Sequence, residues 1–124
     1  MSACTGTIVS TDHRGDPRRP VWEKTVTYVC VTADTTATVP VPIEGILQKI
    51  IFTRPDLANN DLTSTLTIGD RGNKTMFTSA AGLVENVTSV WDVSEPLSGP
   101  CDVLITFNEA VGSAGTFTVV LRGI

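Results

Sequence analysis

Hydrophobic and polar positions alternate in short runs along nearly the whole chain. The clearest run spans residues 22–31, where one side of the alternation is apolar at positions 22, 26, 28 and 30. A second run, 62–68, sets Leu62, Leu66 and Ile68 against three threonines at the intervening positions. A two-residue period is typical of a strand with one buried face, whereas a helix repeats every 3.6 residues. Both segments are therefore predicted to be half-buried strands.

Other runs of branched and apolar residues are bounded by Gly, Pro, Asp and Asn, which favour turns. Gly45 is expected to mark a turn, and 79–85 a short helical connector. The segment 95–100 holds two prolines and a glycine and is expected to end a strand. Antiparallel pairing is expected between the strands at 102–108 and 116–122. It is also expected between 62–68 and 74–78, across the turn at 69–73. The additional strands are predicted at 5–10, 35–41, 46–53, 74–78, 87–93, 102–108 and 116–122.

Composition supports the same fold class. The chain holds 19 Thr and 15 Val among its 124 residues, and β-branched side chains pack well on a pleated surface. We predict an all-β domain, a two-sheet antiparallel β-sandwich of the jelly-roll or Greek-key type with about eight strands. Residues 1–20 are expected to form an N-terminal strand and an exposed arm, and 21–124 the sandwich.

Three strands carry apolar side chains on both faces. They are 50–52, 103–105 and 119–121, each a run of three aliphatic or aromatic residues. In a two-layer sandwich only one face of each sheet is interior. The outward apolar positions therefore predict a homo-oligomer, a dimer or trimer, or docking onto another protein.

Size and charge exclude several functional classes. The 13.2 kDa chain suits one domain, and its net charge of −4 disfavours binding to nucleic acid or anionic membrane. Neither a secretory leader nor an apolar run of about 18 residues is present, so we expect a protein made in a cytoplasm, with no membrane partner. Residues 1–20 carry three Arg and two Asp, a net +1, against −5 for residues 21–124.

Residues that usually perform chemistry are scarce. The single histidine, His13, lies in the proline-flanked segment 11–20 and lacks the rigid support that a general base needs. Cys4, Cys30 and Cys101 are too dispersed for a zinc site. Cys30 is expected to be a core residue, and pairing of Cys4 with Cys101 stays open. We therefore predict no enzymatic activity, no cofactor and no metal; the Asp and Asn cluster at 56–61 is interpreted as turn chemistry.

Several stretches resemble the small accessory proteins of tailed-phage particles, in particular jelly-roll-like capsid decoration or cement proteins. They are LTSTLTIGD at 62–70, LSGP at 97–100 and GTFTVVLRG at 115–123. The resemblance implies a structural virion protein that binds the major capsid protein or other virion subunits.

The predicted contact residues lie at the arm: Arg14, Arg18, Arg19 and Trp22. A locally basic arm on an acidic body suits contact with an acidic neighbour. The alternative is a carbohydrate-binding or tail-fibre-associated adhesion module that stacks sugars on Trp22, Tyr28 or Trp91.

Overall fold

The chain folds entirely into strands and connecting loops over the residues that the structure describes. This computed structural model describes residues 2–12, 22–58, 61–70, 74–80 and 82–124. No described segment is a helix long and apolar enough to cross a membrane. The strands are β1 (Ser2–Ala3), β2 (Thr5–Asp12), β3 (Trp22–Cys30), β4 (Asp34–Thr53), β5 (Thr63–Asp70), β6 (Thr75–Thr78), β7 (Leu83–Val84), β8 (Thr88–Phe107) and β9 (Gly115–Gly123).

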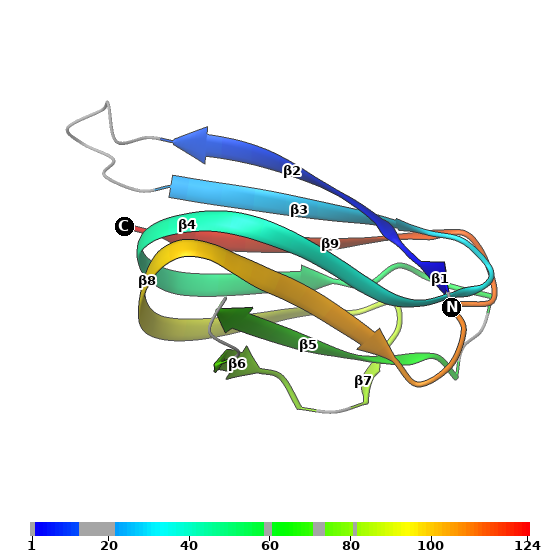
Figure 1. The fold of residues 1–124 in the computed structure, drawn as a ribbon. Helices are drawn as coiled ribbons and strands as arrows, with labels where there is room; N and C mark the ends of the chain where they lie inside the picture. Colours follow the sequence, from blue (N-terminus) through cyan, green and yellow to red (C-terminus); the bar gives the residue numbers. More distant parts are fainter. Residues whose placement is uncertain (1, 13–21, 59–60, 71–73, 81) are drawn as a thin grey trace.

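The strands form one hydrogen-bonded sheet that folds over into two layers (Figure 1). Its order is β2-β3-β9-β4-β8-β5-β6, with β1 beside β4 and β7 beside β5. Strands β4 and β8 are 20 residues each, pair along almost their whole length, and curl together at one end of the molecule. The β3 layer contains β2, β3, β9 and the halves 46–53 of β4 and 88–96 of β8. The β5 layer contains the other halves, with β1, β5, β6 and β7.

Two glycines permit the bend in β4. Gly45 has a φ of 124°, and a Cβ atom there would lie 2.2 Å from the carbonyl oxygen of Ile124. A Cβ on Gly123 would lie 2.1 Å from the carbonyl oxygen of Ile46 and 2.6 Å from the Trp22 ring. Ile46 and Ile124 exchange backbone hydrogen bonds of 2.7 and 3.0 Å, which tie the C-terminus to the bend. Side chains at these glycines would force the strands apart.

The space between the layers is filled by apolar and aromatic side chains. Phe107 of the β5 layer lies against Phe117 of the β3 layer, with 5.1 Å between ring centroids. Tyr28 is fully buried and donates its hydroxyl proton to the carbonyl oxygen of Val103 in the opposite layer. At the margin, Phe77 of β6 packs on Trp91 of β8, with centroids 5.2 Å apart. The two layers therefore share one continuous core.

The alternation seen in the sequence assigns the inner faces correctly. Trp22, Val26, Tyr28 and Cys30 are buried, and so are the even-numbered residues of 62–68. The all-β sandwich fold and the antiparallel pairing of β5 with β6 are confirmed. The strand predicted at 5–10 is confirmed as β2 at a sheet edge.

Four local expectations are wrong. Gly45 bends one long strand instead of ending it, and 95–100 lies within β8. The described part of 79–85 contains the short strand β7 and no helix. β9 pairs with β3 and β4, not with β8.

The prolines inside β4 and β8 lie where these strands pair on one side only. Pro40 and Pro42 of β4 face β8, and beyond Thr36 that half of β4 pairs with no other described strand on its second side. Pro96 and Pro100 of β8 face β4, and pairing with β5 begins only at Cys101. A proline lacks one donor and is tolerated on an edge. Each strand therefore continues through its prolines.

The bend generates a first prediction. Gly45→Ala should lower the free energy of unfolding by about 2–4 kcal/mol, since it combines an overpacked Cβ with an unfavourable positive φ. Gly99→Ala is the matched control, because Gly99 has a φ of 91° and nothing within 4 Å of an added Cβ. Urea unfolding of the two variants separates steric overlap from backbone strain. Equal losses would show that the close approach to Ile124 contributes nothing.

Candidate functional site: the outer face of the β3 layer

The outer face of the β3 layer carries an unbroken row of threonines, one from each of its five strands. The register places them side by side, because each faces the next across a strand pair: Thr7, Thr27, Thr118, Thr53 and Thr88. Strand spacing is roughly 4.8 Å, so the hydroxyl and methyl groups repeat at close intervals. The hydroxyl of Thr88 donates to that of Thr53 over 3.3 Å. The row is exposed or half-buried throughout.

A second row runs parallel to the threonines and is largely aliphatic. It follows the same strand pairs through Val9, Thr25, Val120, Ile51 and Val90. Val9 is 63% exposed and Val90 54%, at opposite margins, while Ile51 and Val120 are half-buried between them. We call the two rows together the Thr/Val face. Ile51 and Val120 belong to the runs predicted to be apolar on both sides, and the structure confirms that they point away from the core.

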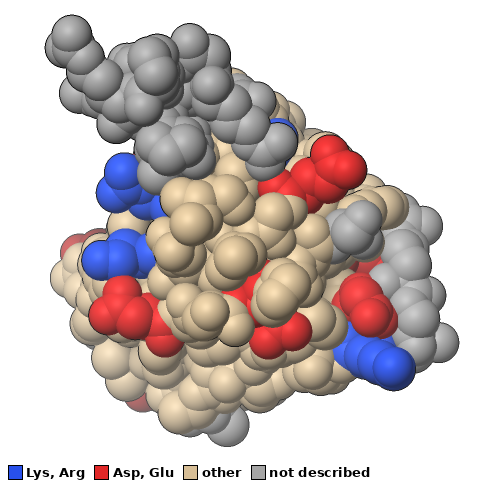
Figure 2. All heavy atoms as spheres, turned by 90° about the vertical axis from the view of Figure 1, so that its left-hand side faces the viewer, with Lys and Arg blue, Asp and Glu red and all other residues tan. Residues whose placement is uncertain are grey.

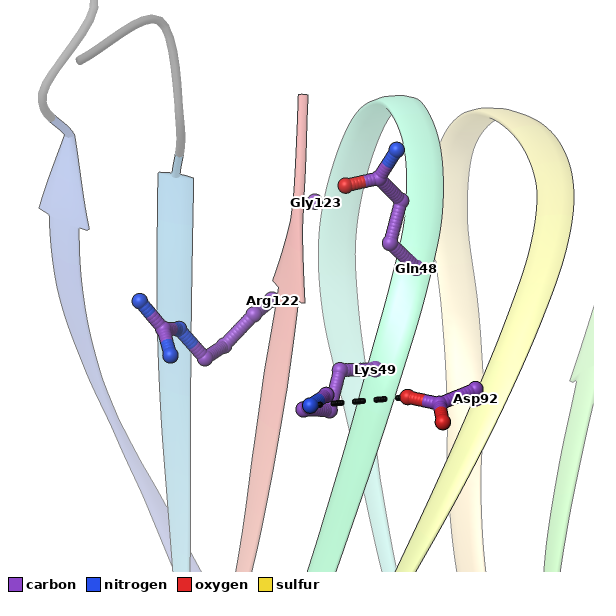
Figure 3. A pocket seen from close by; sticks show the side chains of 5 residues that line it. All are labelled: Gln48, Lys49, Asp92, Arg122 and Gly123. Carbon is purple, nitrogen blue, oxygen red and sulfur yellow. Dashed lines mark ion pairs between the residues drawn. The ribbon is translucent and has the colours of Figure 1, made fainter.

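A third row borders the Thr/Val face with charges that neutralise one another. Lys49 pairs with Asp92 over 3.5 Å, and Arg122 with Glu23 over 3.3 Å. A pocket of about 330 Å³ lies here, lined by Gln48, Lys49, Asp92, Arg122 and Gly123. Figure 3 shows Arg122 pointing away from the Lys49–Asp92 pair, toward β3. The ionisable groups of Lys49 and Asp92 are paired with each other and accessible to solvent, so the chemistry here is that of a polar margin.

Charges of both signs are also interspersed at the bend end of the molecule. Figure 2 shows this end with acidic and basic side chains scattered around an uncharged area. No large field of a single sign is visible there, so this view gives no indication of a polyanion-binding surface.

Of the predicted contact residues, only Trp22 lies in the described part of the chain. Its side chain is 3% exposed and sits against Gly45 and Gly123 at the bend, so the prediction that it contacts a partner on the surface is corrected. Its indole nitrogen is buried with no hydrogen-bond partner in the described structure. Arg14, Arg18 and Arg19 lie outside the described residues, as does His13.

The other aromatic side chains do not form a platform on the surface. Tyr28 is fully buried, and Trp91 is half-buried against Phe77. No aromatic side chain is among the exposed large hydrophobic residues of the described structure. Sugar stacking requires an accessible ring face, so Trp22 and Tyr28 cannot serve in this conformation.

The cysteines pair differently from the expectation. Cys4 and Cys30 form a disulfide, and Cys101 is free and buried. The buried carboxylate of Asp34 lies within 4.8 Å of both disulfide sulfurs and accepts a 2.8 Å hydrogen bond from the amide of Val31. In a disulfide these sulfurs are not thiolate ligands, so the cluster is a cross-link beside a turn. Cys30 is a core residue, as predicted, but a cross-linked one.

Cys101 is poorly suited to nucleophilic chemistry. Burial raises the pKa of its thiol, and the nearby carboxylates of Asp70 and Asp102 raise it further. The thiol therefore stays protonated at neutral pH, and the thiolate is the reactive form.

Arg54 is a buried charged residue that the alternation pattern did not identify. Its side chain is 3% exposed and donates to the carbonyl oxygens of Val84 and Phe52 and to the Ser89 hydroxyl, at 2.6, 3.4 and 3.0 Å. The guanidinium also lies 5.0 Å from the centre of the Phe52 ring. Burial lowers its pKa, although a guanidinium remains charged in proteins. These contacts fix the segment around β7 to β4 and β8, which is a structural role.

Comparison with known proteins gives structural likenesses only. No protein-family model and no curated protein matches the chain. Among solved structures, the arabinose-bound α-L-arabinofuranosidase MgGH51 matches at 10% identity and a TM-score of 0.44, over 99% of this chain and 22% of the other.

The lysozyme inhibitor PliG of Aeromonas hydrophila matches at 13% identity and a TM-score of 0.42, over 80% and 83% of the two chains. The enzymatically active domain of tailspike protein 4 from bacteriophage CBA120 matches at 10% identity and a TM-score of 0.35, over 98% of this chain and 18% of the other. This chain thus spans only about a fifth of the arabinofuranosidase and tailspike chains. At these scores none of the matches carries a functional argument.

The disulfide generates a second prediction. It joins residues 26 positions apart, and closing a loop of that length stabilises a fold by about 3–4 kcal/mol through the unfolded state. Reductant should lower the wild-type free energy of unfolding by that amount and leave Cys4→Ala unchanged, as measured by urea titration. Without reductant, one thiol of three should react in denaturant. A wild type indifferent to reductant would refute the cross-link.

Proposed function

We propose that this protein is a non-enzymatic structural subunit of a virus particle, a capsid decoration or cement protein. In this proposal the Thr/Val face docks on the shell, against the major capsid protein or another virion subunit. The observation that carries the proposal is the Thr/Val face itself, five strands wide and uncharged except at its border. The sequence stretches at 62–70 and 115–123 that resemble decoration proteins support the same class.

The chemistry of the Thr/Val face suits a protein partner. Its methyl and isopropyl groups offer apolar area, while the threonine hydroxyls both donate and accept hydrogen bonds. β-Branched side chains are stiff at χ1, so they lose little rotamer freedom when they are buried. A face without net charge avoids the cost of desolvating ions. These properties favour close packing against another protein surface over binding to a polyanion.

The cross-link also fits a particle that persists outside a cell. Disulfides are stable in oxidising surroundings, virion surfaces included, and are rare where thiols are kept reduced. The Cys4–Cys30 bond attaches the start of β2 to the end of β3, at the same margin of the β3 layer. A decoration protein made in a host cytoplasm would acquire this bond after release.

A third prediction tests the docking face with paired variants. Thr25→Lys/Val120→Lys places two charges in its aliphatic row and should lower attachment at least tenfold. Thr38→Lys/Leu104→Lys is the matched control, since it changes one threonine and one facing aliphatic residue on the outer face of the β5 layer. Attachment is measured by co-sedimentation with particles of the encoding virus from which the protein has been stripped. Equal attachment of both variants would refute docking through the Thr/Val face.

The basic arm is a second proposed contact. In the sequence its arginines lie between Asp12 and Trp22, two described residues that face one another across β2 and β3 at one margin of the β3 layer. Deleting residues 1–20 would remove β1 and β2 and break the disulfide. Charge substitution is therefore the cleaner experiment.

The fourth prediction concerns these arginines. Arg14→Ala/Arg18→Ala/Arg19→Ala should weaken co-sedimentation and make it less dependent on salt, since ion pairs across an interface are screened by salt. The same three positions changed to Lys should retain the salt dependence. If the alanine variant attaches like the wild type at every salt concentration, the arm makes no contribution.

A further inference from the structure

Within the described part of the chain the sheet has several unpaired edges, and all but one of these are blunted. The free edge of β4 carries Pro40 and Pro42, and the free edge of β8 carries Pro96 together with Asp92 and Glu95. At the far side of the β5 layer, β6 has four residues and β7 two. Prolines, charges and short length are the features that keep an edge from pairing with another chain.

Strand β2 has none of these protections. It is eight residues long, pairs with β3 alone among the described strands, and keeps a continuous register from Thr5 to Asp12 with no bulge. Its sequence, TGTIVSTD, contains no proline and no charge before the final Asp12. Val9 near its middle is 63% exposed, the highest value among the exposed large hydrophobic residues. A regular, uncharged edge of this length presents unpaired backbone donors and acceptors to another strand.

We propose that the β2 edge pairs antiparallel with the β2 edge of a second copy of this chain. Facing residues in an antiparallel pair point to the same side of the sheet. A two-fold axis that relates two copies of β2 must therefore pass midway between one residue and its own copy. An axis at Val9 sets the two valines opposite each other and Thr7 opposite Thr11. Gly6 then faces Asp12, so no like charges meet anywhere along the overlap of residues 6–12.

Charge and continuity favour a second copy as the occupant. The β2 edge is nearly neutral, so two copies can approach there although each chain carries a net charge of −4. Val9 is also the end of the aliphatic row of the Thr/Val face. Pairing at Val9 would join two such rows into one row across ten strands. The inference does not depend on what the Thr/Val face binds.

The fifth prediction is a self-repulsion test. Wild-type protein should sediment at equilibrium as a dimer, twice 13.2 kDa, at micromolar concentration. Val9→Lys places two like charges face to face on the axis, so its dissociation constant should rise at least tenfold. Val90→Lys is the matched control and should leave the dimer intact, because Val90 is an exposed valine of the same row at the blunted β8 edge. Urea midpoints close to wild type confirm that both variants fold.

Charge complementation then tests the register. Val9→Glu alone should also dissociate, and an equimolar mixture of Val9→Lys and Val9→Glu should recover the dimer mass, because opposite charges now face each other. A single-chain mass for the wild type would overturn the inference, as would equal dissociation of Val9→Lys and Val90→Lys, or a mixture that stays monomeric. Particle attachment of the Val9→Lys monomer is scored separately, so the failure of this inference and of the docking proposal remain distinguishable.

Discussion

The bend that β4 and β8 share is the constraint on which the rest of the structure depends. Because both strands run through both layers, the backbone hydrogen bonds continue around the end of the sandwich. The layers are therefore one covalent and hydrogen-bonded unit and do not depend on side-chain packing alone. The bend needs a positive φ at Gly45 and room for the chain end at Gly123. Trp22 closes the space that these glycines leave open.

The bend also decides which side chains reach the outer surface. From Ala37 to Leu47 the buried residues of β4 have odd numbers. Beyond Leu47 they have even numbers, Ile50 and Phe52. Against β9 the register shifts between Leu47 and Lys49, because β4 has one extra residue, Gln48, there. A bulge of this kind exchanges the inner and outer faces of a strand. Ile51 thereby joins the Thr/Val face.

The sequence could predict the strands and their faces, because these depend on local alternation. It could not predict the pairing of distant strands or the continuity of β4 and β8. Prolines and glycines signal a turn unless the strand has a free side, and whether it does depends on the topology. The partner of Cys4 is likewise a property of the fold, since β3 brings Cys30 beside it from 26 residues away.

The candidate site was only partly accessible from sequence for the same reason. The apolar excess at Ile51 and Val120 was visible, but the alignment of five threonines arises from four separate strand registers. Trp22 was misassigned because it lies close in sequence to a polar segment, while its neighbours in space are two glycines from elsewhere in the chain.

The Thr/Val face is also suited to remain ordered before any partner arrives. Cross-strand pairs of β-branched residues stabilise a sheet from its own surface, by about 0.2–1 kcal/mol per pair. The face therefore needs no covering layer to keep its shape, and the rigid rows that stabilise the free protein are the same rows that would meet a partner. Binding to a surface ordered in this way costs little conformational entropy. Fold stability and the proposed docking would thus share one cause, the repeated placement of branched, uncharged side chains on neighbouring strands.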